Sequence, residues 1–264
     1  MEERMPDVID VHTPSPARMY DYWLGGKDNF AADREAAEKV IAAHPEQREL
    51  VRANRAFLVR AVRHLAEQGI DQFLDLGTGI PTSPNVHEVA REIRPAARVV
   101  YVDNDPIVFA HNQAFRVTDD RVATVQADIR RPHEVLGDPA LKRLIDFDRP
   151  VALLAVAVLH FVPEGEEVIT TLKEVMAPGS FLALSTGTSE GLTPEQRERI
   201  ENAYAKASAP AVIRSRAEIE RLFTGFDLVD PGLVHVAKWR ADGPETKGRL
   251  LAGVGRLTTS PAAG

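Results

Sequence analysis

The feature that most constrains the fold is a regular alternation of apolar and amphipathic segments that begins at residue 70. Five short runs rich in Val, Leu and Ala are separated by segments with helical periodicity, and they span residues 71–77, 97–105, 122–129, 151–162 and 180–187. Buried strands that alternate with helices are typical of a parallel sheet covered on both faces. Residues 226–240 add two apolar runs joined by a Pro-Gly turn. We therefore expect an α/β fold with a Rossmann-like, doubly wound sheet of seven strands, mostly parallel and closed by an antiparallel strand.

The segments outside this alternation have other patterns. Residues 1–69 have the pattern of a helical cap that ends in a long amphipathic helix with one apolar stripe. Residues 70–240 then form the main domain, and the polar stretch 188–214 within it has the pattern of a helical insertion or lid. Residues 241–264 are expected to be a loosely packed tail.

The first predicted strand ends in the turn Asp75-Leu76-Gly77-Thr78-Gly79, and a helix follows. Glycine tolerates positive φ and lets a ligand approach the backbone closely, so this turn is a candidate cofactor loop. Taken alone, the pattern is equally that of an ordinary turn. A carboxylate beside the glycines suits a cofactor that carries positive charge, whereas a pyrophosphate has no use for it. We therefore predict that Asp75, Gly77, Thr78 and Gly79 bind a cofactor.

Two further predicted strands end in acidic side chains. Asp103 and Asn104 follow the second strand, and Asp128 and Ile129 follow the third. An acidic group at the end of the second strand can accept hydrogen bonds from both ribose hydroxyls of a nucleotide. A carboxylate at the end of the third strand can accept a hydrogen bond from an adenine amino group, with Ile129 against the ring. These four residues are therefore predicted to bind the cofactor.

The order of these motifs resembles that of class I S-adenosylmethionine-dependent methyltransferases. Their glycine motif, [D/E]-x-G-x-G, is matched by Asp75, Gly77 and Gly79, and the resemblance covers roughly residues 70–240. The chain departs from the pattern at Ile80-Pro81, where many relatives have glycine. Segments such as "ARMYDYWLGGKDNFAADR" and "QFLDLGTGIPTSPNVHEVA" are also similar to an S-adenosyl methyltransferase family known mainly from actinobacterial genomes. The resemblance implies the fold and S-adenosyl-L-methionine as cofactor, but no substrate.

The resemblance also suggests where the transfer takes place. Ala155 and Val156 stand at the end of the fourth strand, where the cofactor is expected; the alternative for both is plain core packing. His160 follows at a position that faces the methyl group in many such enzymes. His160 is a candidate base or substrate-orienting group; the alternative is a histidine that bonds only to backbone. Residues 15–30 are predicted to fold over the cleft as a lid and to contribute Tyr20; the alternative is a helix packed elsewhere on the domain.

Composition restricts the partners. The net charge of −7 and the absence of a nucleic-acid motif favour a small-molecule acceptor over RNA or DNA. There is no cysteine, and the histidines show no metal-binding spacing, so we expect no metal site. No apolar run reaches the ~18 residues that span a bilayer, and the acidic N-terminus has no secretory pattern, so a cytoplasmic protein without a membrane partner is expected.

The leading function is therefore methyl transfer from S-adenosylmethionine to a small acceptor, with oxygen preferred over nitrogen because no Asn-Pro-Pro-Tyr-like element follows the fourth strand. Two alternatives stay open. One is a protein that binds S-adenosylmethionine as a sensor without catalysing transfer. The other is an NAD-dependent dehydrogenase, because the fold is shared, although the missing third glycine and the charge of Asp75 speak against it.

Overall fold

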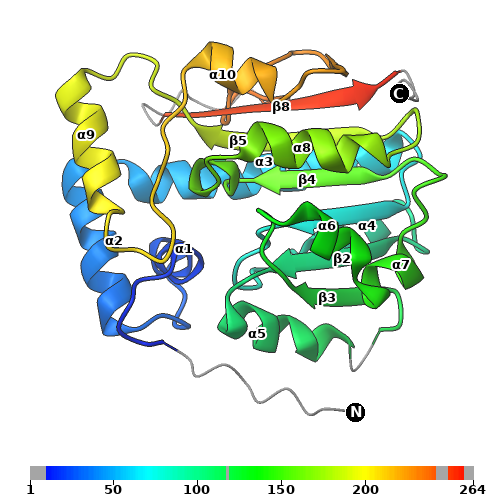
Figure 1. Cartoon of the computed structure of the whole chain (residues 1–264), viewed down its shortest axis with the longest axis horizontal. Helices are drawn as coiled ribbons and strands as arrows, with labels where there is room; N and C mark the ends of the chain where they lie inside the picture. Colours follow the sequence, from blue (N-terminus) through cyan, green and yellow to red (C-terminus); the bar gives the residue numbers. More distant parts are fainter. Residues whose placement is uncertain (1–9, 117–118, 242–248, 259–264) are drawn as a thin grey trace.

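Eight strands form one mixed sheet in the computed structural model, in the order β3-β2-β1-β4-β5-β8-β6, with the short β7 paired to β8 (Figure 1). The structure describes residues 10–116, 119–241 and 249–258. The strands are β1 (Gln72–Leu76), β2 (Arg98–Asp103), β3 (Val122–Gln126), β4 (Ala152–Val156), β5 (Phe181–Gly187), β6 (Phe226–Leu228), β7 (Val234–His235) and β8 (Leu250–Leu257). Strands β1 to β5 pair in parallel, and β8 is antiparallel to β5, β6 and β7. The predicted doubly wound architecture is confirmed, with eight strands in place of seven.

The strand β8 lies where the sequence predicted a loose tail over residues 241–264. It is inserted between β5 and β6, and every one of its residues except Arg256 is buried. The two strands predicted within residues 226–240 both pair with β8 and not with each other. The tail prediction was therefore wrong for β8, and the main domain extends beyond residue 240. The rest of the predicted tail, residues 242–248 and 259–264, lies outside the described residues.

Two glycines explain why β8 escaped prediction. Glycine weakens the strand pattern because it adds no side chain to pack. In the structure, a Cβ at Gly255 would lie 2.8 Å from the Cβ of Phe226, and a Cβ at Gly253 would lie 3.1 Å from the ring of Phe223. The missing side chains make room for these two phenylalanines. The two glycines therefore weaken the strand pattern in the sequence but allow β8 to pack against its neighbours.

Helices cover both faces of the sheet, because successive side chains of a strand point to opposite sides. Leu74 and Leu76 join the core cluster under α6, α7, α8 and α10, whereas Phe73 joins the cluster under α3 and α4. Figure 1 shows α8 in front of the sheet and α3 behind it. These helices and α5 are α3 (Gln47–Glu67), α4 (Val86–Arg91), α5 (Pro106–Arg116), α6 (Pro132–Gly137), α7 (Pro139–Leu144), α8 (Gly165–Glu174) and α10 (Arg216–Arg221).

A third hydrophobic cluster joins the N-terminal helices to the insertion. Its elements are α1 (Pro16–Leu24), α2 (Ala31–Ala43), α3 and α9 (Pro194–Ala203), which gather beside the sheet at the left of Figure 1. Met19 and Trp23 of α1 and Tyr204, which follows α9, are buried there. The predicted insertion at 188–214 thus packs against the predicted cap. Residues 1–9 of that cap lie outside the described residues.

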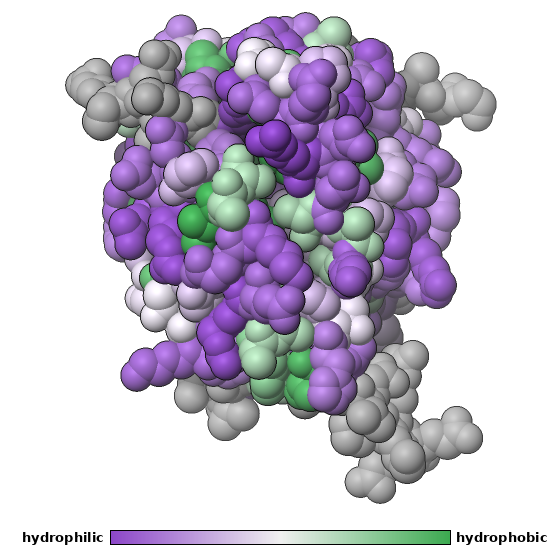
Figure 2. Space-filling model, turned by 90° about the vertical axis from the view of Figure 1, so that its left-hand side faces the viewer, coloured by the Kyte–Doolittle hydropathy of each residue, from purple (hydrophilic) through white to green (hydrophobic). Residues whose placement is uncertain are grey.

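The outer surface of this helical side is mostly hydrophilic, with only separate small hydrophobic areas in the view of Figure 2. Among the described residues, the only large hydrophobic side chains that are exposed are Val175 and Leu228. None of the helices described has the length and apolar character that crossing a membrane requires.

Candidate active site

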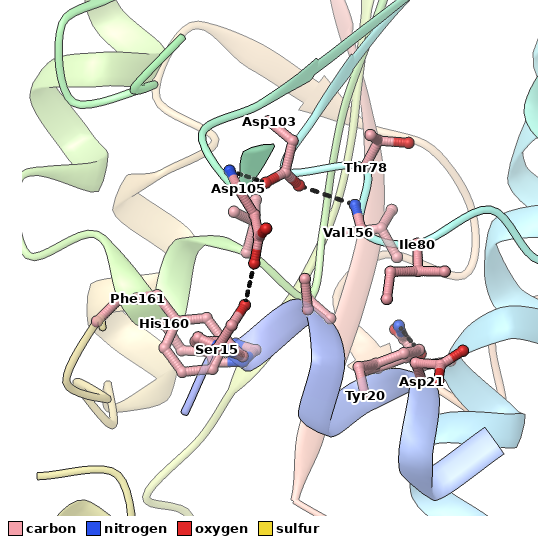
Figure 3. A pocket seen from close by; sticks show the side chains of 18 of the residues that line it. Ser15, Tyr20, Asp21, Thr78, Ile80, Asp103, Asp105, Val156, His160 and Phe161 are labelled. Atoms are coloured by element: carbon pink, nitrogen blue, oxygen red, sulfur yellow. Dashed lines mark hydrogen bonds between the residues drawn. The ribbon is translucent and has the colours of Figure 1, made fainter. Parts of the chain in front are cut away.

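A cavity opens at the carboxyl ends of β1, β2 and β4, between the sheet and the helices α1 and α3 (Figure 3). This edge of a doubly wound sheet is where such folds bind ligands. All the residues predicted for the site except Ala155 border this cavity. They are Tyr20, Asp75, Gly77, Thr78, Gly79, Asp103, Asn104, Asp128, Ile129, Val156 and His160.

Ala155 is the exception because of the alternation along β4. Its side chain is fully buried in the core together with Leu153, while Val156 faces the other way and borders the cavity. Ala157, which the sequence did not single out, borders the cavity as well and has a φ of 57°. An alanine in the left-handed region is strained, and such strain is concentrated at functional sites. The turn at Ala157 directs the chain into the short 3-10 helix Leu159–Phe161.

The glycine loop does two different things. Gly77 has a φ of 62°, and a Cβ at this position would lie 2.2 Å from Cγ2 of Val158, so glycine is required for packing. Gly79 has a φ of 66°, but no atom lies within 4 Å of the place its Cβ would occupy. At Gly79 the backbone of the loop is therefore open to the cavity. The departure at Ile80-Pro81 leaves this opening in place.

Two buried carboxylates stand beside the loop. Asp75 is 5% exposed and accepts a hydrogen bond from Oγ1 of Thr78 at 3.0 Å; its burial raises its pKa to about 7. Asp103 is 7% exposed, and its burial raises its pKa to about 6, although backbone hydrogen bonds from Asp105 and Gly79 oppose the rise. Taking a carboxylate out of water without a cation is costly. Both groups therefore favour a positively charged or hydrogen-bond-donating ligand.

Asp128 differs from these two because it already has a cation. Its Oδ2 lies 2.6 Å from Nη2 of Arg130, and burial, which would raise the pKa of Asp128, is outweighed by the hydrogen bonds from Arg130, which lower it. Arg130 also borders the cavity and was not predicted from the sequence. An adenine amino group at Asp128 would share the carboxylate with Arg130.

The ring of His160 lies against that of Phe161, with 4.3 Å between their centroids. Burial, helped by the nearby charge of Arg214, lowers the pKa of His160 to about 3. Its Nδ1 is buried and has no hydrogen-bond partner among the described residues. The imidazole is therefore neutral near pH 7, and the structure does not support the alternative of a histidine bonded to backbone through its ring.

Tyr20 has a different environment. Its hydroxyl donates to the carbonyl oxygen of Val51 at 3.0 Å and accepts from Nδ2 of Asn54 at 2.9 Å. Burial raises its pKa to about 12, so the hydroxyl stays protonated. Asn54 in turn accepts a hydrogen bond from Oγ of Ser185 at 2.6 Å, which links α1 through α3 to β5. Tyr20 borders the cavity, but its hydroxyl holds the helices together and is not free to act as a base.

Polar contacts tie α1 to the end of β2. Oγ of Ser15 donates to Oδ2 of Asp105 at 2.6 Å (Figure 3); this serine stands at the N-cap position of α1, but its side chain makes no capping hydrogen bond there. Arg18 lies 3.2 Å from the fully buried Asp33 and 3.8 Å from Asp105. Ser15 and residues of α1 thus border the cavity, and the lid over residues 15–30 stays a prediction.

Sequence reasoning missed several residues that border the cavity, among them Arg55, Phe161 and Tyr204. Arg55 donates to the carbonyl oxygens of Thr82 and Pro84 at 2.6 and 2.9 Å, so it holds the loop after Gly79. Tyr204 carried a signal that was overlooked, since it is the only aromatic residue in the polar stretch 188–214. The neighbouring α9 has no buried residues.

Comparison with known proteins places these features in a family. The family model for S-adenosyl methyltransferases matches residues 2–258. A candidate methyltransferase from Thermobifida fusca YX is 41% identical, with 95% of this chain and 97% of that chain covered and a TM-score of 0.89. A DUF574 family protein from Streptomyces avermitilis MA-4680 is 42% identical, with 94% and 99% covered and a TM-score of 0.88.

More distant structures share the fold alone. Human N-acetylserotonin methyltransferase, solved in complex with S-adenosylmethionine, is 14% identical, with 91% of this chain and 62% of that chain covered and a TM-score of 0.51. A search of curated protein sequences gave no significant match. The family match covers nearly all of the chain and both of the 41–42% identical structures agree with it, so the chain belongs to the S-adenosyl methyltransferase family.

Proposed function

We propose that this cavity binds S-adenosylmethionine and that the protein transfers its methyl group to a small-molecule acceptor. The observation that carries the proposal is the pair of buried carboxylates, Asp75 and Asp103, on either side of a glycine loop that is open at Gly79. A cofactor with an ammonium and a sulfonium would bring positive charge to these two carboxylates. Membership of the S-adenosyl methyltransferase family supports the same cofactor.

The residues present fit this cofactor part by part. Asp75 and the backbone at Gly79 would hold its amino-acid end, since the place of a Gly79 Cβ is open space. Asp103 would accept hydrogen bonds from the ribose hydroxyls. Ile129 is buried at the end of the third strand, where an adenine ring would contact it. Val156, which borders the cavity from the end of β4, would pack against the cofactor.

We further propose an oxygen acceptor. When bound, S-adenosylmethionine would supply an electrophilic methyl group, whose transfer to an acceptor oxygen would leave the carbon–sulfur electron pair on sulfur and release the acceptor proton to water. The neutral imidazole of His160 can orient a hydroxyl by hydrogen bonding, but a pKa of about 3 makes it a poor base. Alignment and exclusion of water by α1 are then the main contributions of the protein.

Calorimetry tests the cofactor, and a transfer assay tests the reaction. We expect S-adenosylhomocysteine and S-adenosylmethionine to bind the wild-type protein. We expect no heat of binding for NAD. Incubation with S-adenosylmethionine labelled in the methyl group, together with pooled small alcohols and phenols, should then give labelled ethers. Binding of NAD in preference to S-adenosylhomocysteine would contradict the proposal.

A further inference from the structure

Tyr204 is a buried residue whose hydroxyl has no hydrogen-bond partner among the described residues. The chain has four tyrosines, and the hydroxyls of the other three make hydrogen bonds, with Val51 and Asn54, with Glu38, and with His87. Tyr204 is only 6% exposed and borders the cavity, yet its hydroxyl makes no hydrogen bond with any described residue. Buried polar groups in native proteins are nearly always paired. The hydroxyl of Tyr204 therefore has hydrogen-bonding capacity that a ligand in the cavity could use.

A second unpaired group lies close by. Phe161 separates Tyr204 from His160: its ring centroid is 5.3 Å from that of Tyr204 and 4.3 Å from that of His160. Neither ring nitrogen of His160 makes a hydrogen bond with the described residues, and all three side chains border the cavity. A hydroxyl and a neutral imidazole, each with unused hydrogen-bonding capacity, thus flank one apolar ring.

The charges around the cavity limit what these groups can bind. Two arginines border it in the described part of the chain, and both are engaged: Arg55 with the carbonyl oxygens of Thr82 and Pro84, and Arg130 with Asp128. An anionic acceptor would find no uncommitted cation among these residues, and an unpaired buried anion is strongly disfavoured.

We propose that Tyr204 and His160 bind the polar group of the methyl acceptor, and that this acceptor is an uncharged planar molecule that rests against Phe161. The inference rests on the proposed function, because it concerns the part of the same cavity that the cofactor leaves free. Aromatic side chains favour flat apolar partners. Tyr204 would then determine specificity, since a site whose hydroxyl needs a partner discriminates against molecules that lack one.

Three probes of similar size test the chemistry on the full-length protein saturated with S-adenosylhomocysteine. They are 2-naphthol, which is uncharged at neutral pH and has a hydroxyl, 2-naphthoate, which is an anion, and 2-methylnaphthalene, which has no hydrogen-bonding group. Dissociation constants are measured by ligand-observed NMR. We expect 2-naphthol to bind at least about tenfold more tightly than 2-naphthoate, because the anion would be buried without a cation.

The variant Tyr204→Phe then isolates the hydroxyl. It should weaken 2-naphthol about two- to tenfold, and it should leave 2-methylnaphthalene and S-adenosylhomocysteine unaffected. Its melting temperature should stay the same or rise, because no protein hydrogen bond is lost. Tyr22→Phe is the matched control, since the hydroxyl of Tyr22 bonds to Glu38 and this residue does not border the cavity; it should change no probe affinity.

Three outcomes overturn the inference: equal binding of 2-naphthoate and 2-naphthol, no binding of 2-naphthol, or a Tyr204→Phe variant that binds all probes like the wild type. A clear fall in the melting temperature of Tyr204→Phe would also count against it, because the hydroxyl would then already have a hydrogen-bond partner in the protein without acceptor, for example a bound water. If the wild-type protein does not bind S-adenosylhomocysteine at all, it is the proposed function that fails.

Discussion

The amide nitrogen of Gly79 donates a hydrogen bond to Oδ2 of Asp103, 2.9 Å away. This bond joins the loop after β1 to the end of β2, the two places where the amino-acid end and the ribose of the cofactor are proposed to bind. Oδ1 of Asp103 accepts a second bond from the amide of Asp105, whose own carboxylate accepts a hydrogen bond from Ser15 at the start of α1. Hydrogen bonds therefore join the glycine loop, the end of β2 and the start of α1.

Asp103→Ala should weaken S-adenosylmethionine binding about tenfold or more, because a charge-assisted hydrogen bond is worth roughly 1.5–3 kcal/mol. Isothermal calorimetry measures the change. Asp227→Ala, on the exposed edge of β6, is the control and should bind like the wild type. An unchanged affinity in Asp103→Ala would show that the ribose lies elsewhere.

Gly79→Val should abolish cofactor binding while the domain still folds, because the new side chain would occupy space that is open only to the cavity. Any branched residue at positive φ is strained by about 1–2 kcal/mol. Gly232→Val controls for this strain: Gly232 has a φ of 82° and nothing within 4 Å of its Cβ position, but it does not border the cavity. If both variants bind the cofactor alike, the loop is only a turn.

Ser15→Ala should loosen the lid. The hydroxyl of Ser15 bonds to Asp105 and does not cap α1, so the substitution removes the tie and leaves the helix end as it was. Loss of about 1 kcal/mol should speed hydrogen exchange in residues 15–30 roughly fivefold, and cofactor should slow exchange there in the wild type. Ser215→Ala, which removes the cap of the distant α10, should not affect these residues. Exchange that responds to neither cofactor nor Ser15→Ala would make α1 a packing element alone.

Cofactor affinity should rise with pH between about 6 and 7. Burial raises the pKa of Asp75 to about 7, so part of the population carries a proton that a cationic ligand must displace. Calorimetry in buffers of different ionisation enthalpy should detect proton release near pH 6.5, and Asp75→Asn should reduce it. Proton uptake, or no linkage in the wild type, would contradict the assignment of a cation to Asp75.

The same shifts predict the stability of the protein without cofactor. A carboxyl whose pKa is higher in the folded state than in the unfolded state stabilises the fold at low pH, and this contribution is lost as pH rises through the folded value. Asp75, at about 7, and Asp103, at about 6, should therefore lower the free energy of unfolding between about pH 4 and 7. Urea unfolding of the wild type against Asp75→Asn over this range measures the effect. A difference that does not depend on pH would mean that Asp75 ionises normally.

The positions that sequence reasoning placed well are those fixed by local pattern. Strand ends can be read from hydrophobic runs, and parallel topology brings those ends together, so Asp75, Asp103 and Asp128 could be located in advance. Ala155 failed because the pattern gives the end of a strand to within a residue, whereas the alternation of side chains decides which residue faces the cavity.

Other features depend on contacts between distant segments and leave little local trace. Tyr204 joins the site only because its insertion folds back on α1 and α2. A single tyrosine in a polar stretch does not predict this packing. Gly253 and Gly255 make the segment look unlike a strand in the sequence. Their role is explained only by the neighbouring phenylalanines in the folded protein. In both cases the deciding interaction is tertiary, and local propensity was overridden by it.

The place of β8 in the sheet has a consequence for how the chain is made. Synthesis delivers β5, β6 and β7 first, but β6 and β7 have no strand to pair with until residues 250–257 leave the ribosome. Until then β5 is an open edge, and unpaired edges invite association with other chains. The nascent protein therefore finishes this sheet only after residues 250–257 have been translated. A messenger truncated before codon 250 would yield a product open to aggregation or proteolysis, even though its cofactor loop is complete.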